Sequence, residues 1–188
     1  MSEFNIEVQG GSSVRLPTAG KYCDRDIIVK ASGGGGWSLE GFVTGTEPIG
    51  DIVIGAITPK AYVLSRNMYI TSLVCDGTIF NADGTGAFAY LSEAESITLK
   101  NTSGAMPGLI FAYASNALVA KIIGSCPLLP SNAFNGFGAN YSIGQPVIYV
   151  PWAEDDPLNA NAPWGATRAT IKYNTTYDTN DNPITSEV

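Results

Sequence analysis

The chain has 188 residues, of which 45% are hydrophobic, and this is enough for one domain with a buried core. Ten basic and 17 acidic side chains give a net charge of −7, which argues against a nucleic-acid groove or a patch for anionic membranes. Histidine is absent, which excludes Ser-His-Asp and Cys-His catalysis, histidine-ligated metals and histidine pH switches.

Only 14% of the residues are charged, whereas about a quarter is usual. The chain also holds 21 glycines and 11 prolines. This composition is typical of a β-rich, turn-rich body and not of a helical bundle. It also predicts a surface covered by Ser, Thr, Asn and Gly, or by another chain. We therefore expect a mostly β fold.

The cysteines and the first residues bear on the cellular compartment. Cys23, Cys75 and Cys126 form no Cys-x-x-Cys pair and are odd in number, so we expect buried thiols in a reducing cytoplasm and neither a disulfide framework nor a zinc site. The opening MSEFNIEV lacks the basic and apolar segments of a signal peptide. No apolar run reaches the ~18 residues of a membrane span. Export, if it occurs, is expected inside a particle released by lysis.

Residues 1–32 predict a small N-terminal β module. Strand-like stretches lie at residues 5–8, 13–16 and 26–31, and residues 17–20 mark a turn. Two or three strands support themselves poorly, so this module should lean on a partner or on copies of itself. The four glycines at 33–36 predict a flexible linker, because they lack the Lys-Ser/Thr of a phosphate loop.

Residues 37–173 contain a repeat with a period near 23 residues. An aromatic residue after a small or apolar one recurs at intervals of 26, 23 and 23, at Tyr62, Phe88, Phe111 and Phe134. Eleven positions after the first three lie strand-like stretches containing Leu73, Leu99 and Ile122. After Phe134 the register slips, and the matching strand is expected at 147–150. This period, with one strand per turn, lies within the range of leucine-rich repeats.

One such turn cannot bury its apolar side chains alone, whereas stacked turns bury them as a continuous column. We therefore expect a small solenoid of about four turns, with Phe88, Phe111 and Phe134 in single file. Residues 37–60 and 151–173 are expected to cap its two ends. Residues 174–188 form a polar tail, which should fray unless a neighbour holds it.

Three stretches resemble known proteins. The Ala-Phe pair upstream of a short Leu/Ile strand, over residues 57–150, resembles the BspA-like class of leucine-rich repeats. The runs IYVPWAE at 148–154 and APWGAT at 162–167 are similar to the end segment of such repeat proteins encoded by tailed bacteriophages and prophages of gut-type bacteria. The run at 11–29 resembles a module recurring in phage virion and tail-associated proteins.

These resemblances imply a non-enzymatic virion structural protein of the tail-fibre, baseplate or head-fibre type, made in the cytoplasm of the host bacterium. Residues 1–32 would attach to other virion proteins, and the solenoid would be displayed for adhesion to a host-surface glycan or protein. Analogy with phage fibres implies a homo-oligomer, and a trimer for a fibre. Binding to nucleic acid and insertion into a membrane are not expected.

Two alternatives stay open. One is a purely structural capsid-decorating or tail-stabilising protein. The other is a carbohydrate-binding module or a glycan depolymerase, for which paired carboxylates would be needed. The acidic candidates are Glu93, Glu95, Glu154, Asp155 and Asp156. Nothing in the sequence brings two of them together around a cleft, so no catalytic residue is expected.

Neither a cofactor nor a metal site is expected. Residues 178–182 alternate oxygen-bearing side chains somewhat like a calcium loop. An EF-hand loop also needs a central glycine and a glutamate at its twelfth position, and both are missing. We therefore interpret this stretch as a solvated turn in a polar tail.

Four aromatic residues are candidates for contact with a ligand: Tyr90, Tyr113, Trp152 and Trp164. The repeat phenylalanines are expected in the core. Tyr90 and Tyr113 each come two residues after a repeat phenylalanine, where exposure is compatible with the repeat. Such rings could form a platform for sugars, with Asn and Asp side chains contacting the hydroxyl groups.

Overall fold

The structure is a computed structural model that describes residues 70–184 throughout and residues 50–56, 58 and 59. Nearer the N-terminus it describes four strands, which are β1 (Phe4–Gln9), β2 (Ser13–Arg15), β3 (Ile27–Ser32) and β4 (Ser38–Glu40). The glycine linker at 33–36 and the repeat aromatic Tyr62 lie outside the described residues.

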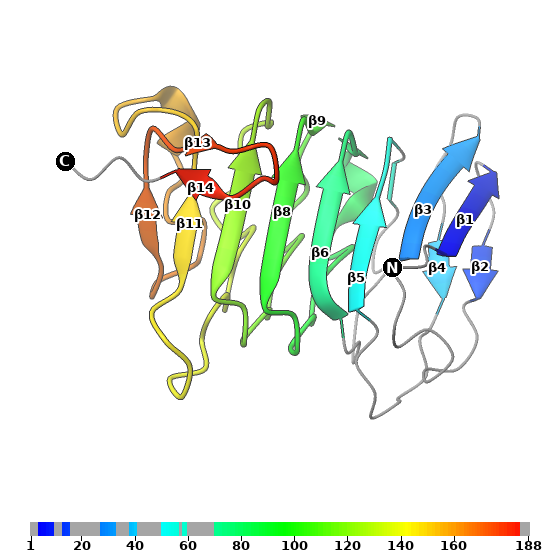
Figure 1. Cartoon of the computed structure of the whole chain (residues 1–188), viewed down its shortest axis with the longest axis horizontal. Helices are drawn as coiled ribbons and strands as arrows, with labels where there is room; N and C mark the ends of the chain where they lie inside the picture. The colour runs from blue at the N-terminus through cyan, green and yellow to red at the C-terminus, as the bar shows by residue number, and fades with distance from the viewer. Residues whose placement is uncertain are drawn as a thin grey trace.

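One eight-stranded sheet organises the chain (Figure 1). Its strands lie in the order β1, β3, β5, β6, β8, β10, β11, β12, and every neighbouring pair is parallel. The later members are β5 (Gly50–Ile54), β6 (Ile70–Asp76), β8 (Ser96–Lys100), β10 (Val119–Ile123), β11 (Val147–Tyr149) and β12 (Thr170–Lys172). Because the order in the sheet follows the order in the chain, each coil adds one strand beside the previous one.

The coil length stays nearly constant along this sheet. Phe4 on β1 pairs with Ile27 on β3, 23 residues further on. The shortest step joins Asp51 to Ser72, and the longest joins Val119 to Val147, 28 residues apart. The predicted mostly β fold of stacked parallel strands is therefore confirmed.

The stack is longer than the four turns expected. Residues 1–32 contribute β1 and β3 to the same sheet, and β3 pairs with β5 across the linker, with Ile27 opposite Ile52. The turn count was too low because the N-terminal coils carry no repeat phenylalanine to mark them. Whether residues 1–32 form a separate domain stays a prediction.

Smaller elements complete the coils. A second parallel pairing joins β7 (Ile79–Phe80) to β9 (Ser103–Gly104), and another joins β2 to β4. Two short 3₁₀ helices, η1 (Ala82–Gly84) and η2 (Pro157–Asn159), lie in the connections. The described residues contain no α-helix. No helix in that part of the chain is long and apolar enough to cross a membrane.

Alternate residues of the strands face the core, as the period of a strand requires. On β8, for example, Ile97 and Leu99 are fully buried. Paired inward residues form rows across the sheet, such as the row of Leu73, Ile97 and Ala120. Each row is made of one residue per coil, so no coil has a complete core of its own.

The repeat phenylalanines stand in single file behind the sheet, as the sequence predicts. The ring centroids of Phe88 and Phe111 are 5.8 Å apart, and those of Phe111 and Phe134 are 5.2 Å apart. The rings are nearly parallel, at 12° and 22°, and all three side chains are fully buried. The backbone runs as a ladder beside them: the N–H groups of Phe88 and Phe111 donate to the carbonyls of Ile110 and Ala133, at 3.0 and 2.9 Å.

The chain leaves the main sheet through a left-handed residue after each of three strands. These residues are Gly77, Asn101 and Gly124, with φ of 70°, 49° and 68°. Glycine adopts this conformation without steric cost, and asparagine tolerates it better than most residues. At Gly124 the coils also approach closely, since a Cβ there would lie 2.1 Å from Oδ1 of Asn101.

Gly124→Ala should therefore lower the free energy of unfolding by about 1–3 kcal/mol, from left-handed strain and the clash with Asn101. The matched control is Gly144→Ala, where a Cβ would meet only Leu118 Cδ2, at 3.8 Å. The control should stay within about 0.5 kcal/mol of the parent chain. Urea unfolding measures both variants, and equal stability of the two would contradict this account of the corner.

Candidate functional site

Tyr90 and Tyr113 form an exposed stacked pair on the outside of successive coils. Their ring centroids are 4.7 Å apart, the rings are inclined by 16°, and each side chain is 43% exposed. Both residues have φ of 63°, which is rare for a bulky side chain. Their backbone N–H groups donate to Ala112 and Asn135, each at 2.7 Å. The ladder between coils therefore holds both residues in this conformation.

The tyrosine column ends at Gly136 in the next coil. A Cβ on Gly136 would lie 3.3 Å from Cδ1 of Tyr113, so the Tyr113 ring lies close over a glycine backbone. Tyr113 thus has Tyr90 on one side and Gly136 on the other. A ligand can reach the edge and hydroxyl of this ring, while flat stacking of a sugar on its face is blocked. The predicted exposure of the two tyrosines is confirmed, and their contact with a ligand stays a prediction.

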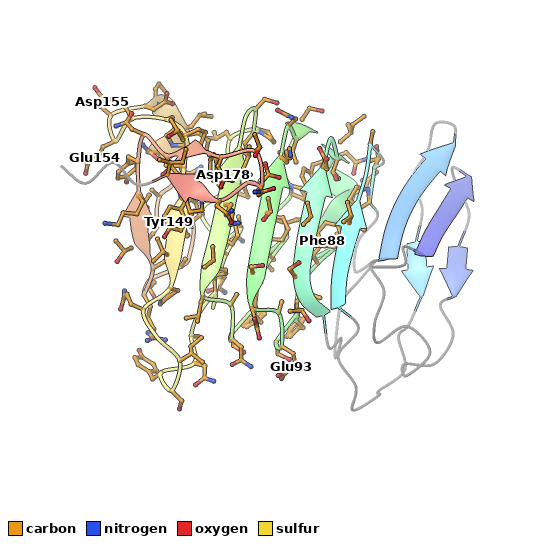
Figure 2. All side chains as sticks on the ribbon, in the orientation of Figure 1. Phe88, Glu93, Tyr149, Glu154, Asp155 and Asp178 are labelled. Carbon is orange, nitrogen blue, oxygen red and sulfur yellow. The ribbon has the colours of Figure 1, made fainter. Side chains whose placement is uncertain are left out.

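A ladder of polar side chains follows the tyrosines by three residues in each coil. Asn140 Nδ2 donates to Asn116 Oδ1 at 2.8 Å, and Asn116 Nδ2 donates to Glu93 Oε2 at 3.4 Å. Figure 2 shows Glu93 at the edge where β6 and β8 begin. Together with the two tyrosines, these three side chains form the strip that we call the tyrosine–asparagine strip. It presents amide, carboxylate and phenol groups in the repeat of the coils.

The strip continues into the last coil through Arg168. Its Nη1 donates to the carbonyls of Gly138 and Asn140, the latter at 2.8 Å. The guanidinium carbon lies 4.2 Å from the ring centroid of Tyr141, within the range of a cation–π contact. Arg168 therefore fastens the loop that carries Tyr141, which is 83% exposed.

Trp152 and Trp164 lie in the core and not on the surface. Trp164 is fully buried and Trp152 is 9% exposed, and the two rings pack edge to face, with centroids 6.5 Å apart. Trp152 Nε1 donates to Asn159 Oδ1 at 2.8 Å, while Trp164 Nε1 has no hydrogen-bond partner. These two predicted ligand-facing rings have almost no surface with which to meet a ligand. Instead they fill the end of the core beyond the phenylalanine column.

The acidic candidates are not gathered into one cleft. Glu154 and Asp155 are exposed on the last coil, and Figure 2 shows them far from Glu93. Asp156 caps η2, where its Oδ1 accepts from the N–H of Leu158 at 2.8 Å. Among the described residues, no group of three or more Asp, Glu, Cys or His side chains could hold a metal ion.

The described cysteines are shielded from solvent. Cys75 is fully buried on β6, and burial raises the pKa of its thiol. Burial likewise raises the pKa of Cys126 to about 12. Both thiols are therefore protonated and weakly nucleophilic at neutral pH. Cys23 lies outside the described residues.

The polar tail folds back over the outer face of the main sheet (Figure 1). Residues 173–184, which we call the C-terminal strap, contain the antiparallel strands β13 (Thr176–Tyr177) and β14 (Pro183–Ile184). Lys100 Nζ bonds both carboxylate oxygens of Asp181, at 2.8 and 3.0 Å, and this hydrogen bonding raises the pKa of Lys100. Lys121 Nζ donates to the carbonyl of Asp181 at 2.9 Å. The sheet of the same chain is thus the neighbour that holds the tail.

The stretch that alternates oxygen-bearing side chains forms the tip of the strap. Asp178 Oδ1 accepts from the N–H groups of Asn180 and Asn182, both at 2.8 Å, and Oδ2 accepts from Asn182 Nδ2 at 3.0 Å. These bonds, the backbone bond from Asn182 first, lower the pKa of Asp178. Their stabilisation of the turn is present at neutral pH and is lost as the pH falls through that lowered pKa. The predicted turn is confirmed.

A groove of about 540 Å³ lies between the strap tip and the outer face of the sheet. Its floor consists of the first halves of β6, β8 and β10, and Asn180 and Asp181 form its wall. The sequence analysis missed this groove. The floor residues look like ordinary solvent-facing positions of strands, and no local signal places residue 181 beside residue 100.

Comparisons with protein-family models, with curated proteins and with solved structures found no match to this chain. The functional conclusions below therefore depend on the geometry of this structure and on the resemblances in the sequence.

The strap contacts predict the effect of Lys100→Met. Both partners of the Lys100–Asp181 pair are about one-third exposed, so the pair is worth about 0.2–1 kcal/mol. Removing it should accelerate amide hydrogen exchange in residues 176–184 by up to about fivefold. The matched control, Lys172→Met on the exposed face of β12, should leave this exchange unchanged. Unchanged exchange in Lys100→Met would show that the salt bridge does not hold the strap.

Proposed function

We propose that this chain is a non-enzymatic virion structural protein of a tailed bacteriophage, which displays a β-solenoid for adhesion to the host surface. The resemblances at residues 11–29, 148–154 and 162–167 support the phage assignment. The observation that carries the adhesion role is the exposed, stacked pair of Tyr90 and Tyr113 beside the polar ladder.

The pair is suited to binding because it is already ordered. Phe88 and Phe111 fix each coil from the inside, and the backbone ladder fixes each tyrosine. A ligand that contacts these rings would cost little additional side-chain entropy. Tyrosine also offers an apolar ring edge and a hydroxyl together, a combination common in binding surfaces. The ligand class is a glycan or a protein of the host surface.

Attachment to the particle is assigned to residues 1–32. In the described sheet β1 pairs only with β3, so its other edge is open for strand addition by another virion chain or a sister subunit. A homo-oligomer, trimeric in a fibre, would multiply weak contacts into avidity. The coils are assigned to the BspA-like leucine-rich repeats, an assignment supported by one strand per coil eleven residues after a buried phenylalanine.

Adhesion is tested with the fluorescently labelled chain on intact cells from a panel of gut bacteria. The double variant Tyr90→Ala, Tyr113→Ala should bind a recognised strain at least about tenfold more weakly, a loss of about 1.4 kcal/mol. The matched control, Tyr141→Ala, removes an equally aromatic but more exposed side chain and should retain binding.

Three outcomes would contradict the proposal. Binding to no strain, or equal binding by the double variant and the control, would exclude adhesion through the tyrosine pair. Antibody labelling of intact particles that finds the chain covered by other virion proteins would favour the purely structural alternative. Release of soluble saccharide from cells by the pure chain would favour a depolymerase.

A further inference from the structure

We propose that the groove beneath the C-terminal strap binds an extended, uncharged polyhydroxylated chain, that is, a linear segment of neutral glycan. This inference deepens the proposed function by naming a ligand class, and it rests on that function for the source of the glycan at the host surface. The binding itself is argued from the lining of the groove.

The floor of the groove repeats with the coils. The strands β6, β8 and β10 pair in register, so the outward residues lie in rows across the sheet. The two rows in the groove are Ser72, Ser96 and Val119, followed by Val74, Thr98 and Lys121. Neighbouring strands are about 4.8 Å apart, which is close to the length of one sugar unit in an extended polysaccharide. Successive units of a linear glycan can therefore meet successive coils.

The side chains in these rows match the chemistry of a sugar. Sugar rings present hydroxyl groups at their edges and C–H groups on their faces. The floor offers the hydroxyls of Ser72, Ser96 and Thr98 beside the apolar side chains of Val74 and Val119. Thr98 is only 7% exposed, and within the described residues the hydroxyls of Ser96 and Thr98 make no hydrogen bond. A nearly buried hydroxyl gains from a partner, and a glycan hydroxyl would supply one.

The charges around the groove favour a neutral ligand. The Asp181 carboxylate is already bonded to Lys100, and the Lys121 ammonium is bonded to the carbonyl of Asp181. Glu95 is the remaining charged side chain in the lining, and it is exposed at the rim. Neither an anionic nor a cationic ligand would therefore find a cluster of unpaired opposite charge.

An extended peptide fits the groove less well. Peptides that bind sheets usually add to an edge strand, whose N–H and C=O groups are unpaired. The strands β6, β8 and β10 are interior strands, each paired on both sides. Their backbone groups are thus already used, and recognition must come from the side chains on the floor and from Asn180 on the wall.

The test uses the full chain, labelled with ¹⁵N, and hexasaccharides of glucose and of N-acetylglucosamine with their disaccharides. At least one neutral hexasaccharide should shift the amide signals of residues 71–74, 95–98 and 118–121 to saturation. It should bind at least about tenfold more tightly than its disaccharide, because it spans several coils. If none of the neutral hexasaccharides shifts these signals, or if an anionic oligogalacturonide binds more tightly, the inference is wrong.

Ser96→Tyr should fill the groove and weaken hexasaccharide binding at least about tenfold. The matched control, Ser103→Tyr, places the same side chain on the exposed strand β9, which belongs to another sheet, and should bind like the parent chain. Circular dichroism checks that both variants fold. If Ser96→Tyr does not fold, Asn180→Ala replaces it, since it removes an exposed amide of the wall without altering the sheet.

The same variants separate this inference from the proposed function. Glycan in the groove without adhesion to cells would leave the inference standing and remove the adhesion role. Adhesion to cells by a chain whose Ser96→Tyr variant binds hexasaccharide as well as its control would leave the adhesion role standing and remove the groove as a glycan site.

Discussion

The stacking of one coil upon the next is the interaction on which the rest of this structure depends. No coil has a complete core, because each row of buried side chains takes one residue from every coil. The phenylalanine column, with centroids 5.8 and 5.2 Å apart, is the largest apolar part of that shared core. Backbone ladders run beside it at the sheet and at the aromatic segment. Burial and hydrogen bonding therefore act along the same axis.

This axis also arranges the surface. Because equivalent residues lie one above another, an outward side chain in one coil meets its equivalent in the next. The Tyr90–Tyr113 stack and the Asn116–Asn140 hydrogen bond are direct results of this register. The outward rows of the groove arise in the same way on the opposite side of the strands. A repeated surface of this kind suits ligands that are themselves repetitive, such as polysaccharides.

Part of this architecture could be predicted from the sequence. The spacing of Phe88, Phe111 and Phe134 was sufficient for the single-file column, since a recurring aromatic has one low-energy place in a stack. The same spacing placed Tyr90 and Tyr113 outside the core. The number of coils was underestimated, because β1 and β3 have the coil length without a phenylalanine marker.

Other features depend on long-range contacts that no local pattern reports. Trp164 and Tyr113 are both aromatic residues with positive φ, yet one is fully buried and the other is 43% exposed. The difference comes from their surroundings, since Trp164 fills the end of the core. The strap depends on a contact between residues 81 positions apart, Lys100 and Asp181. The groove exists only because the strap lies there, so it could be found only from the three-dimensional structure.

A double-mutant cycle on the phenylalanine column tests the stacking most directly. Phe88→Leu and Phe111→Leu, singly and together, would be measured by urea unfolding, with Phe88→Leu and Phe134→Leu as the comparison cycle. Rings in contact should couple by about 0.5–1.5 kcal/mol. Phe88 and Phe134, which have Phe111 between them, should couple by less than about 0.5 kcal/mol. Absence of coupling between Phe88 and Phe111, or equal coupling in both cycles, would contradict a core built by the stacking of successive coils.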